Sequence, residues 1–222
     1  MPIQTLQSMN FNIIPTITDG MGKGVLAGLL AKPISRANII KTITSLVAQY
    51  NYQGIDLDFE NFAFVDGNTT WATTAPLWSQ FVIELSTALH AQNKLLSLTT
   101  PVSFDPATGK KGYYVYSWPT IGQYIDRLRI MTYDYSVATP GPIGPINWTE
   151  DAVKYAVSQI PASKIYVGIP GYGRDWITKV DGTCPSDVSS IIKVGAKAAT
   201  FVLRDAVNLA SSYNATPTYV DK

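Results

Sequence analysis

Residues 53–61 of the chain read Gln-Gly-Ile-Asp-Leu-Asp-Phe-Glu-Asn. Side chains alternate between the two faces of a β-strand, and alternate residues along it lie ~6.6 Å apart. The stretch therefore predicts a strand over 54–60 with one apolar face and one entirely acidic face. The acidic face consists of Asp56, Asp58 and Glu60.

Similar apolar, β-branched runs recur along the chain, with helical patterns between them. Strands are expected over residues 12–17, 54–60, 95–101, 128–133 and 165–170. Helices are expected from Ser35 to about residue 50, from Pro76 to about 91, and over 119–127, 149–160 and 198–213. This alternation predicts an α/β fold with a parallel sheet, either an open doubly wound sheet or a closed barrel.

An acidic row is costly inside such a sheet. Branched apolar residues normally fill a parallel barrel, and neighbouring buried carboxylates cannot all ionise easily. At least one carboxyl of the row is therefore expected to have a raised pKa and to hold a proton near neutral pH, as a general acid must. Three other interpretations stay open: a half-exposed antiparallel strand, a divalent-metal site of oxygen ligands, and the Asp-x-Asp pair of a nucleotide-sugar transferase.

The composition narrows the function classes. The chain has 222 residues, of which 46% are apolar and only 15% charged, with a net charge of +1. It lacks the basic footprint of a nucleic-acid-binding protein, and no apolar run approaches the ~20 residues that span a bilayer. The single cysteine, Cys184, excludes an internal disulfide, and with the single histidine, His90, it excludes a zinc site of the usual Cys/His type. We expect neither a metal ion nor a cofactor.

Three stretches together resemble the signatures of glycoside hydrolase family 18, the chitinase family. Residues 54–60 match the end of the pattern Asp-Gly-x-Asp-x-Asp-x-Glu, although Gln53 replaces its first Asp. Residues 131–134, Met-Thr-Tyr-Asp, and 168–174, Gly-Ile-Pro-Gly-Tyr-Gly-Arg, are similar to two further family elements. The resemblance implies a TIM barrel and is strongest to the bacterial branch that includes spore-germination and cell-wall hydrolases.

The resemblance also implies a catalytic scheme. Glu60 protonates the glycosidic oxygen and then acts as base on the incoming water. The nucleophile is the carbonyl oxygen of the substrate's own 2-acetamido group, so the anomeric configuration is retained. Asp58 orients that group and Asp56 exchanges charge with Asp58. Tyr133 donates a hydrogen bond to the acetamido oxygen, and Asp134 contacts the sugar. The expected partner is a polysaccharide or oligosaccharide with N-acetylated sugars, and chitin and the glycan of peptidoglycan both fit.

Further residues are candidates for sugar binding. Met131 belongs to the second motif. Tyr172 and Arg174 belong to the third motif and follow the last expected strand, where barrel loops build the cleft. Aromatic rings that either stack on a pyranose face or simply pack are those of Trp118, Trp148 and Trp176. A non-catalytic chitinase-like sugar-binding protein on the same scaffold is the alternative function.

The expected fold is a partial TIM (β/α)8 barrel. The family barrel has eight strands, and the motifs assign the five strands of this chain to positions three to seven. The resemblance therefore implies an internal piece of a longer enzyme, with a partial catalytic barrel over 1–177 and a truncated insertion after strand seven over 178–222. Low charge, one cysteine and a polymeric substrate favour an extracellular or cell-envelope location. The sequence indicates no oligomeric state.

Overall fold

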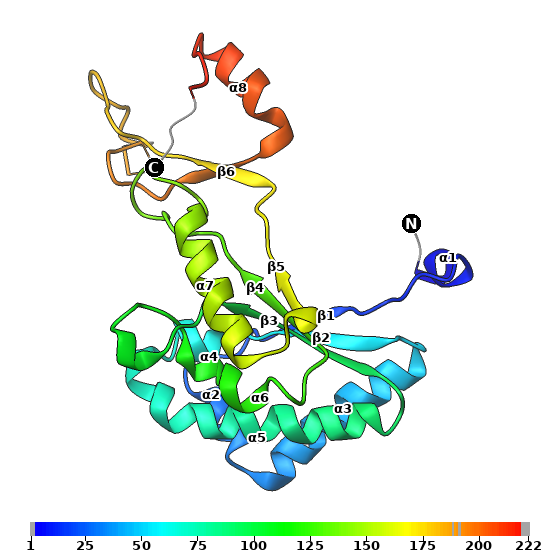
Figure 1. Cartoon of the computed structure of the whole chain (residues 1–222). Coiled ribbons are helices and arrows are strands. Elements are labelled where there is room, and N and C mark those ends of the chain that lie inside the picture. Colours follow the sequence, from blue (N-terminus) through cyan, green and yellow to red (C-terminus); the bar gives the residue numbers. More distant parts are fainter. Residues whose placement is uncertain (1–2, 188, 191, 219–222) are drawn as a thin grey trace. The chain divides into compact units, whose positions relative to one another are not determined.

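The acidic stretch lies in the second strand of a five-stranded sheet (Figure 1). The computed structural model describes residues 3–187, 189–190 and 192–218. The sheet has the order β1-β2-β3-β4-β5, and every neighbouring pair is parallel. Its strands are β1 (Thr16–Thr18), β2 (Gly54–Asp58), β3 (Leu95–Pro101), β4 (Arg127–Met131) and β5 (Ile165–Val167). A sequential order without reversal belongs to a barrel, whereas a doubly wound sheet reverses its order at a switch point.

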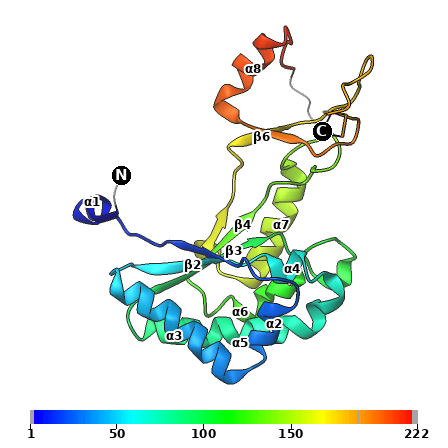
Figure 2. The ribbon, with the colours of Figure 1, turned by 180° about the vertical axis from the view of Figure 1, so that it is seen from behind.

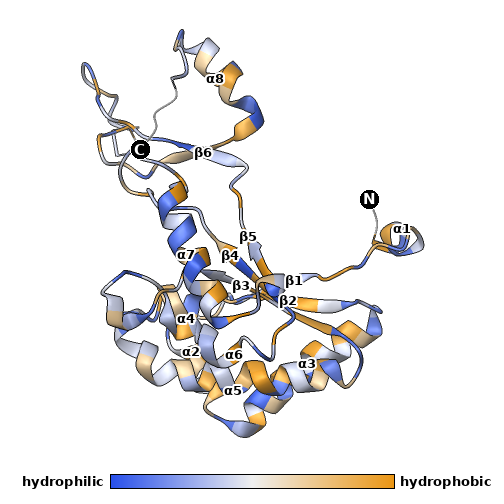
Figure 3. Cartoon of the chain, in the orientation of Figure 1, coloured by the Kyte–Doolittle hydropathy of each residue, from blue (hydrophilic) through white to orange (hydrophobic). Residues whose placement is uncertain are grey.

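One face of this sheet is apolar and covered by helices. Its side chains, none more than 1% exposed, are those of Ile55, Leu57, Leu96, Leu98, Leu128 and Ile130. Two long helices, α3 (Pro33–Gln49) and α5 (Trp71–His90), lie side by side against the sheet in both views (Figure 1 and Figure 2). Both carry apolar and hydrophilic residues, as amphipathic helices do (Figure 3). The burial of this face leaves the opposite face to the polar residues of the strands.

Gly54 shows why β2 begins with glycine. It pairs with Leu95 of β3 in the sheet register. A Cβ atom at this position would run into the backbone of Leu95, so any side chain would push the two strands apart. The glycine of the first motif therefore has a packing reason that is independent of catalysis.

An aromatic cluster anchors the end of β2. Phe59 directly follows the strand, is 4% exposed and packs against Trp78 and Phe81 of α5, with ring centroids 6.1 and 6.4 Å away. Phe62 stacks on Trp78 at 4.8 Å, and Tyr116 meets Phe62 edge-on at 5.0 Å. These buried rings fix the backbone on either side of Glu60.

The C-terminal end of α5 is tied to the sheet through the chain's one histidine. His90 Nε2 lies 2.8 Å from Asp126 Oδ2, and the same oxygen accepts the backbone N–H of Leu96 at 2.8 Å. One carboxylate thus joins the helix end to the start of β3.

Contacts divide the chain into two compact units. The first, Met1–Met131 with Ala152–Val167, contains the parallel sheet. The second, Thr132–Asp151 with Gly168–Lys222, contains the antiparallel pair β6 (Tyr172–Asp175) and β7 (Ala199–Val202) and the helix α8 (Ala206–Ser212).

The remaining α-helices are α1 (Ile3–Ser8), α2 (Val25–Leu30), α4 (Asn61–Phe64), α6 (Trp118–Ile121) and α7 (Ile146–Gln159). Short 3₁₀ turns are η1 (Asn68–Thr70), η2 (Pro106–Thr108), η3 (Tyr114–Tyr116), η4 (Ala162–Lys164) and η5 (Leu203–Asp205). The boundary between residues 177 and 178 stays a prediction.

Three expected elements are wrong. The helix expected over 119–127 ends at Ile121 as α6, and Arg127 is the first residue of strand β4. Helix α5 begins at Trp71 and not at Pro76, because the Trp71 ring packs on Tyr113 at 5.2 Å and its Nε1 donates to the Ala63 carbonyl at 3.1 Å. The single helix expected over 198–213 is strand β7, a 3₁₀ turn and α8, since residues 199–202 pair with β6. In the described ranges, no helix is long and apolar enough to cross a bilayer.

Candidate active site

Asp56 is the buried centre of the acidic row. Its side chain has no exposed surface, and its Oδ2 accepts hydrogen bonds from Thr99 Oγ1 at 2.8 Å and Thr16 Oγ1 at 3.1 Å. Its Oδ1 lies 3.9 Å from Arg129 Nε, and no hydrogen bond reaches that oxygen from the described residues. Groups from three other strands, β1, β3 and β4, therefore hold this carboxylate.

Asp58 lies one pleat further along β2 and differs from Asp56 in its surroundings. Burial, and after it the negative charges of Asp56 and Asp19, raise the pKa of the Asp58 carboxyl, while a hydrogen bond with Glu60 acts in the opposite direction. Within the part of the chain that the structure describes, its buried Oδ1 has no hydrogen-bond partner. The direction of this pKa shift is the one expected for the row.

Glu60 lies just beyond the strand. The strand expected over 54–60 ends at Asp58, and Glu60 turns to φ −118° and ψ −30° as the residue that precedes α4. Burial raises the pKa values of the Tyr113 and Tyr116 phenols, and the negative charge of Glu60 is the next cause for both. The Glu60 carboxyl is therefore close to two phenols as well as to Asp58.

A second carboxylate, Asp134, is surrounded by donors. Tyr172 OH donates to Asp134 Oδ1 at 2.6 Å, and Arg174 donates to the same oxygen from Nη2 at 2.5 Å and Nε at 3.2 Å. Burial, followed by the hydrogen bond to Asp134, raises the pKa of the Tyr172 phenol. Asp134 has a φ of 60°, a left-handed conformation that is uncommon outside glycine but tolerated best by Asn and Asp. These three residues, the Asp134 cluster, line a hollow of about 360 Å³.

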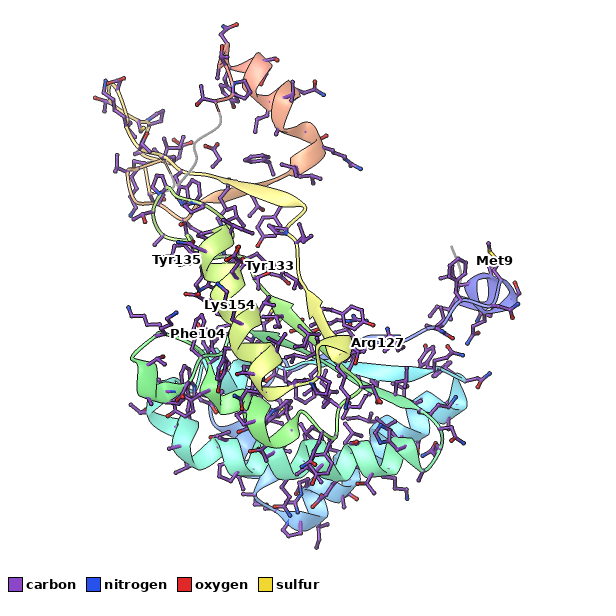
Figure 4. The ribbon with its side chains drawn as sticks, viewed as in Figure 1. Met9, Phe104, Arg127, Tyr133, Tyr135 and Lys154 are labelled. Atoms are coloured by element: carbon purple, nitrogen blue, oxygen red, sulfur yellow. The ribbon has the colours of Figure 1, made fainter. Side chains whose placement is uncertain are left out.

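Four further aromatic residues of the second unit have ring or hydrogen-bond contacts, and one of them, Tyr133, contacts this cluster. Tyr133 meets the Tyr172 ring edge-on at 6.2 Å, and Tyr135 packs on Trp148 at 5.2 Å. Figure 4 labels Tyr133 and Tyr135, which both come from the segment after β4. Trp176 Nε1 donates to the Val137 carbonyl at 3.0 Å. Each of these rings therefore already has a structural contact.

Sequence and structure indicate the same family. The indications are the three motifs, the partial parallel barrel and the acid row at the C-terminal end of a strand. The profile of the family described as "Glycosyl hydrolases family 18" matches residues 5–216. The chain belongs to glycosyl hydrolase family 18.

Known relatives agree with this family-18 assignment. The chain is 29% identical over 196 residues to the "Putative sporulation-specific glycosylase YdhD" of Bacillus subtilis, which is 85% of this chain and 44% of that protein. It is 26% identical over 152 residues to the cortical fragment-lytic enzyme of Bacillus subtilis, 67% of this chain and 33% of that protein. The chain thus spans less than half the length of these curated relatives.

Solved structures of similar proteins confirm the partial TIM-barrel fold. The crystal structure of YdhD has a TM-score of 0.82 at 25% identity and covers 98% of this chain and 68% of that chain. A chitinase from Chromobacterium violaceum has a TM-score of 0.79 at 24% identity, with 98% and 63% covered.

The structure places the candidate residues of this family-18 chain in two groups. The first unit holds Asp56, Asp58 and Glu60 together, with Met131 at the end of β4. The second unit joins Asp134, Tyr172 and Arg174 in one cluster and also contains Tyr133 and Trp148. Of the two alternatives for Trp118, the structure favours packing, because its side chain is completely buried and donates Nε1 to Thr100 Oγ1 at 3.2 Å.

Several residues around the acid row escaped the sequence analysis. Asp19, Thr99 and Arg129 follow or belong to expected strands, and Tyr113 and Tyr116 come from the segment after β3. For two of these residues, the sequence of the strands contained a pattern that could have identified them. Thr99 and Arg129 are polar residues that alternate with buried apolar ones, the pattern of an inward face. Among the residues of described placement, no three His, Cys, Asp or Glu side chains are grouped to hold a metal ion.

Proposed function

We propose that this family-18 chain carries the acid machinery of a retaining hydrolase that cleaves β-1,4 bonds in N-acetylglucosamine-containing glycans. The observation that supports it most is the state of Asp58. This carboxyl has a raised pKa, bonds to Glu60 and presents a buried Oδ1 without a partner among the described residues. A carboxyl with a raised pKa that is hydrogen-bonded to a second carboxyl suits acid–base chemistry.

In the first step, the bond between C1 and the glycosidic oxygen breaks. Its electron pair goes to the leaving oxygen, which takes a proton from Glu60. The acetamido carbonyl oxygen of the substrate forms a new bond to C1 and displaces the leaving sugar. Asp58 holds the acetamido N–H and stabilises that nitrogen as it gains positive character, and Asp56 exchanges charge with Asp58.

In the second step, water attacks C1 and the acetamido oxygen leaves. Glu60, now a carboxylate, accepts the proton of the water and returns to its starting state. Two inversions at C1 give net retention, and no enzyme carboxylate becomes bonded to the sugar. The roles of Tyr133 as a donor to the acetamido oxygen and of Asp134, Met131, Tyr172, Arg174 and Trp148 in sugar binding stay predictions.

Two substrates fit this chemistry, chitin and the glycan of spore-cortex or cell-wall peptidoglycan. The names of the relatives include both a cortical fragment-lytic enzyme and chitinases. Both polymers carry the 2-acetamido group that the mechanism requires. Both also lie outside the cytoplasm of the cell that is attacked, so we expect the protein to act extracellularly or in the cell envelope.

The deciding experiment uses Glu60→Gln in the intact protein. The amide cannot donate the proton, and we expect turnover of chitin oligomers and of cortex fragments to fall by on the order of 10²-fold or more. Glu150→Gln is the matched control, because Glu150 is an exposed glutamate in the second unit. We expect the same change there to leave turnover at the parental rate. Product analysis by NMR should show the β-anomer first.

Each outcome of this comparison is informative. Turnover of Glu60→Gln at the parental rate contradicts the assignment of the acid. Tight sugar binding by the parent without turnover of either polymer would favour the non-catalytic sugar-binding protein. Cleavage of oligomers that lack the acetyl group would contradict the acetamido nucleophile. The ratio of rates on chitin oligomers and on cortex fragments identifies the substrate.

A further inference from the structure

Asp19 is a buried carboxylate directly after β1 that the mechanism above does not use. It is 8% exposed. Its Oδ1 accepts the backbone N–H groups of Glu60 at 2.7 Å and Asn61 at 3.0 Å, and its Oδ2 lies 3.1 Å from the Asn61 nitrogen. A side chain that is 41 residues away in the sequence therefore binds the backbone of the expected general acid.

The chain needs such a partner at this point. Strand β2 ends at Asp58, and α4 begins at Asn61. The first N–H groups of a helix have no partner within the helix, and a side chain of the preceding residue usually accepts one of them. Here the preceding residue is Glu60, whose side chain makes no capping bond within the described chain. Asp19 accepts the first of these donors, the N–H of Asn61, together with the N–H of Glu60 itself, while the N–H groups of Ala63 and Phe64 donate to the Glu60 carbonyl.

Asp19 also acts through its charge. Its negative charge is a cause of the raised pKa values of Asp58 and Tyr116. The ionisable groups near Glu60 include Asp19, Asp58 and the phenols of Tyr113 and Tyr116. Removal of the Asp19 charge is expected to make the neighbouring carboxyls ionise more easily.

The segment after Asp19 is fastened to the segment after Glu60 at two further points. Asn61 Nδ2 donates to the Met21 carbonyl at 2.8 Å, and the Gly24 N–H donates to Asp66 Oδ1 at 2.7 Å. Asp66 is 5% exposed, so it resembles Asp19 in burial and in binding a backbone N–H. Of these two carboxylates, only Asp19 binds the backbone of Glu60.

We propose that Asp19 is a positioning residue, which sets both the backbone geometry of Glu60 and the charge around it. This inference rests on the proposed function in which Glu60 is the proton donor. The effect on catalysis is exerted through Glu60, since Asp19 bonds to its main chain.

Two substitutions in the intact protein separate geometry from charge. In Asp19→Asn the amide oxygen can take the place of Oδ1, so both hydrogen bonds survive while the charge is lost. We expect the pH profile of kcat/KM to shift toward lower pH, with only a modest loss of kcat at the optimum. In Asp19→Ala both bonds are lost, and we expect kcat to fall by on the order of 10²-fold with little change in KM.

Asp66→Asn and Asp66→Ala are the matched controls. They remove the same charge or the same kind of backbone hydrogen bond from the same pair of segments, and we expect both to lower stability without moving kcat or the pH profile. Hydrogen exchange supplies a readout that does not depend on turnover. Asp19→Ala should speed exchange of the Glu60 and Asn61 amides, whereas Asp66→Ala should not.

The possible failures can be told apart. Parental turnover in Glu60→Gln overturns the proposed function, and hydrogen exchange still tests the hold of Asp19 on the Glu60 backbone. An inactive Glu60→Gln beside an Asp19→Ala with parental kcat, pH profile and amide exchange overturns the role of Asp19 alone. Equal effects of Asp19→Ala and Asp66→Ala on kcat and pH profile show that the role is general stability, and also overturn it.

Discussion

Asp58 and Asp134 are two carboxylates with opposite surroundings. Asp58 has acidic neighbours, a raised pKa and a buried oxygen to which no described residue donates. Asp134 receives donors from Tyr172 and Arg174 on one oxygen, although 40% of its side chain is exposed. The surroundings of Asp58 therefore disfavour its ionised form, whereas those of Asp134 supply hydrogen-bond donors to its carboxylate.

This difference distinguishes a carboxyl that suits proton transfer from one that holds neighbouring side chains in place. A carboxyl among like charges holds its proton to a higher pH than an isolated carboxyl does, which suits proton transfer. A carboxylate that accepts hydrogen bonds from an arginine and a phenol fixes the position of the groups around it. The motif-derived roles also distinguish the two residues, since Asp58 is assigned to the reaction and Asp134 to sugar contact.

The largest expected effect in this comparison is that of Asp58→Asn. The substitution removes the charge that stabilises the developing cation, so we expect kcat to fall by on the order of 10²-fold. The same change removes an unfavourably placed charge, so we expect the free energy of unfolding at pH 7 to rise by about 0.5 kcal/mol after allowance for solvent screening of a half-buried group. Steady-state kinetics and denaturant unfolding measure the two effects.

The gain in stability should depend on pH in a defined direction. The pKa of Asp58 is higher in the folded protein than in the unfolded chain, so the folded state binds more protons between the two values. The contribution of Asp58 to stability is therefore fully present below the unfolded pKa and is lost as the pH rises through the folded pKa. Asp58→Asn should be no more stable than the parent in acid and more stable above that window. A gain confined to low pH would contradict the direction of the shift.

A smaller effect is expected when Asp56, the neighbour of Asp58 on the same face of β2, loses a hydrogen-bond donor. Thr99→Val removes the 2.8 Å hydrogen bond to the buried Asp56 Oδ2, and we expect a loss of about 2 kcal/mol in the free energy of unfolding. Thr16→Val is the control, because that bond is longer, at 3.1 Å, and the residue is exposed, so water can replace the hydroxyl. Equal losses in the two variants would show that burial of the donor does not matter here.

The smallest effect is expected in the Asp134 cluster. Arg174→Met removes two donors from Asp134, and partial exposure of the carboxylate limits the expected loss to about 1 kcal/mol. Lys179→Met is the control in the same unit, since Lys179 and Asp181 form a pair with 77% and 80% exposed side chains. Denaturant unfolding should show almost no change for it. A higher free energy of unfolding in Arg174→Met than in the parent would contradict the contrast, because it would show that Asp134, like Asp58, lies in unfavourable surroundings.

The acid row was predictable because its signal is local. Alternation over residues 54–60 fixes which side chains share a face, and Gly54 and Asp56 lie in the strand as expected. The exit of Glu60 from the strand was not predictable, since the donors of its turn are satisfied by Asp19. A contact between residues 41 positions apart in the sequence cannot be predicted from the pattern of a few neighbouring residues.

Other errors have similar causes. The proline rule for helix starts pointed to Pro76, but tertiary contacts of Trp71 extend α5 by five residues before it. Residues 199–202 were expected to be helical and instead pair with β6, because a partner strand outweighs local propensity. Trp118 was an even choice between stacking and packing, and only burial against Thr100 could decide it.

His90 gives the fold a built-in reporter. It is the chain's one histidine, so its ring protons give a single, separate set of NMR signals. The Asp126 carboxylate that binds its ring also accepts the Leu96 N–H at the start of β3. The chemical shift of one imidazole therefore registers whether this part of the sheet is intact, and substitutions in the acid row can be checked for folding without labelling the protein or adding a substrate.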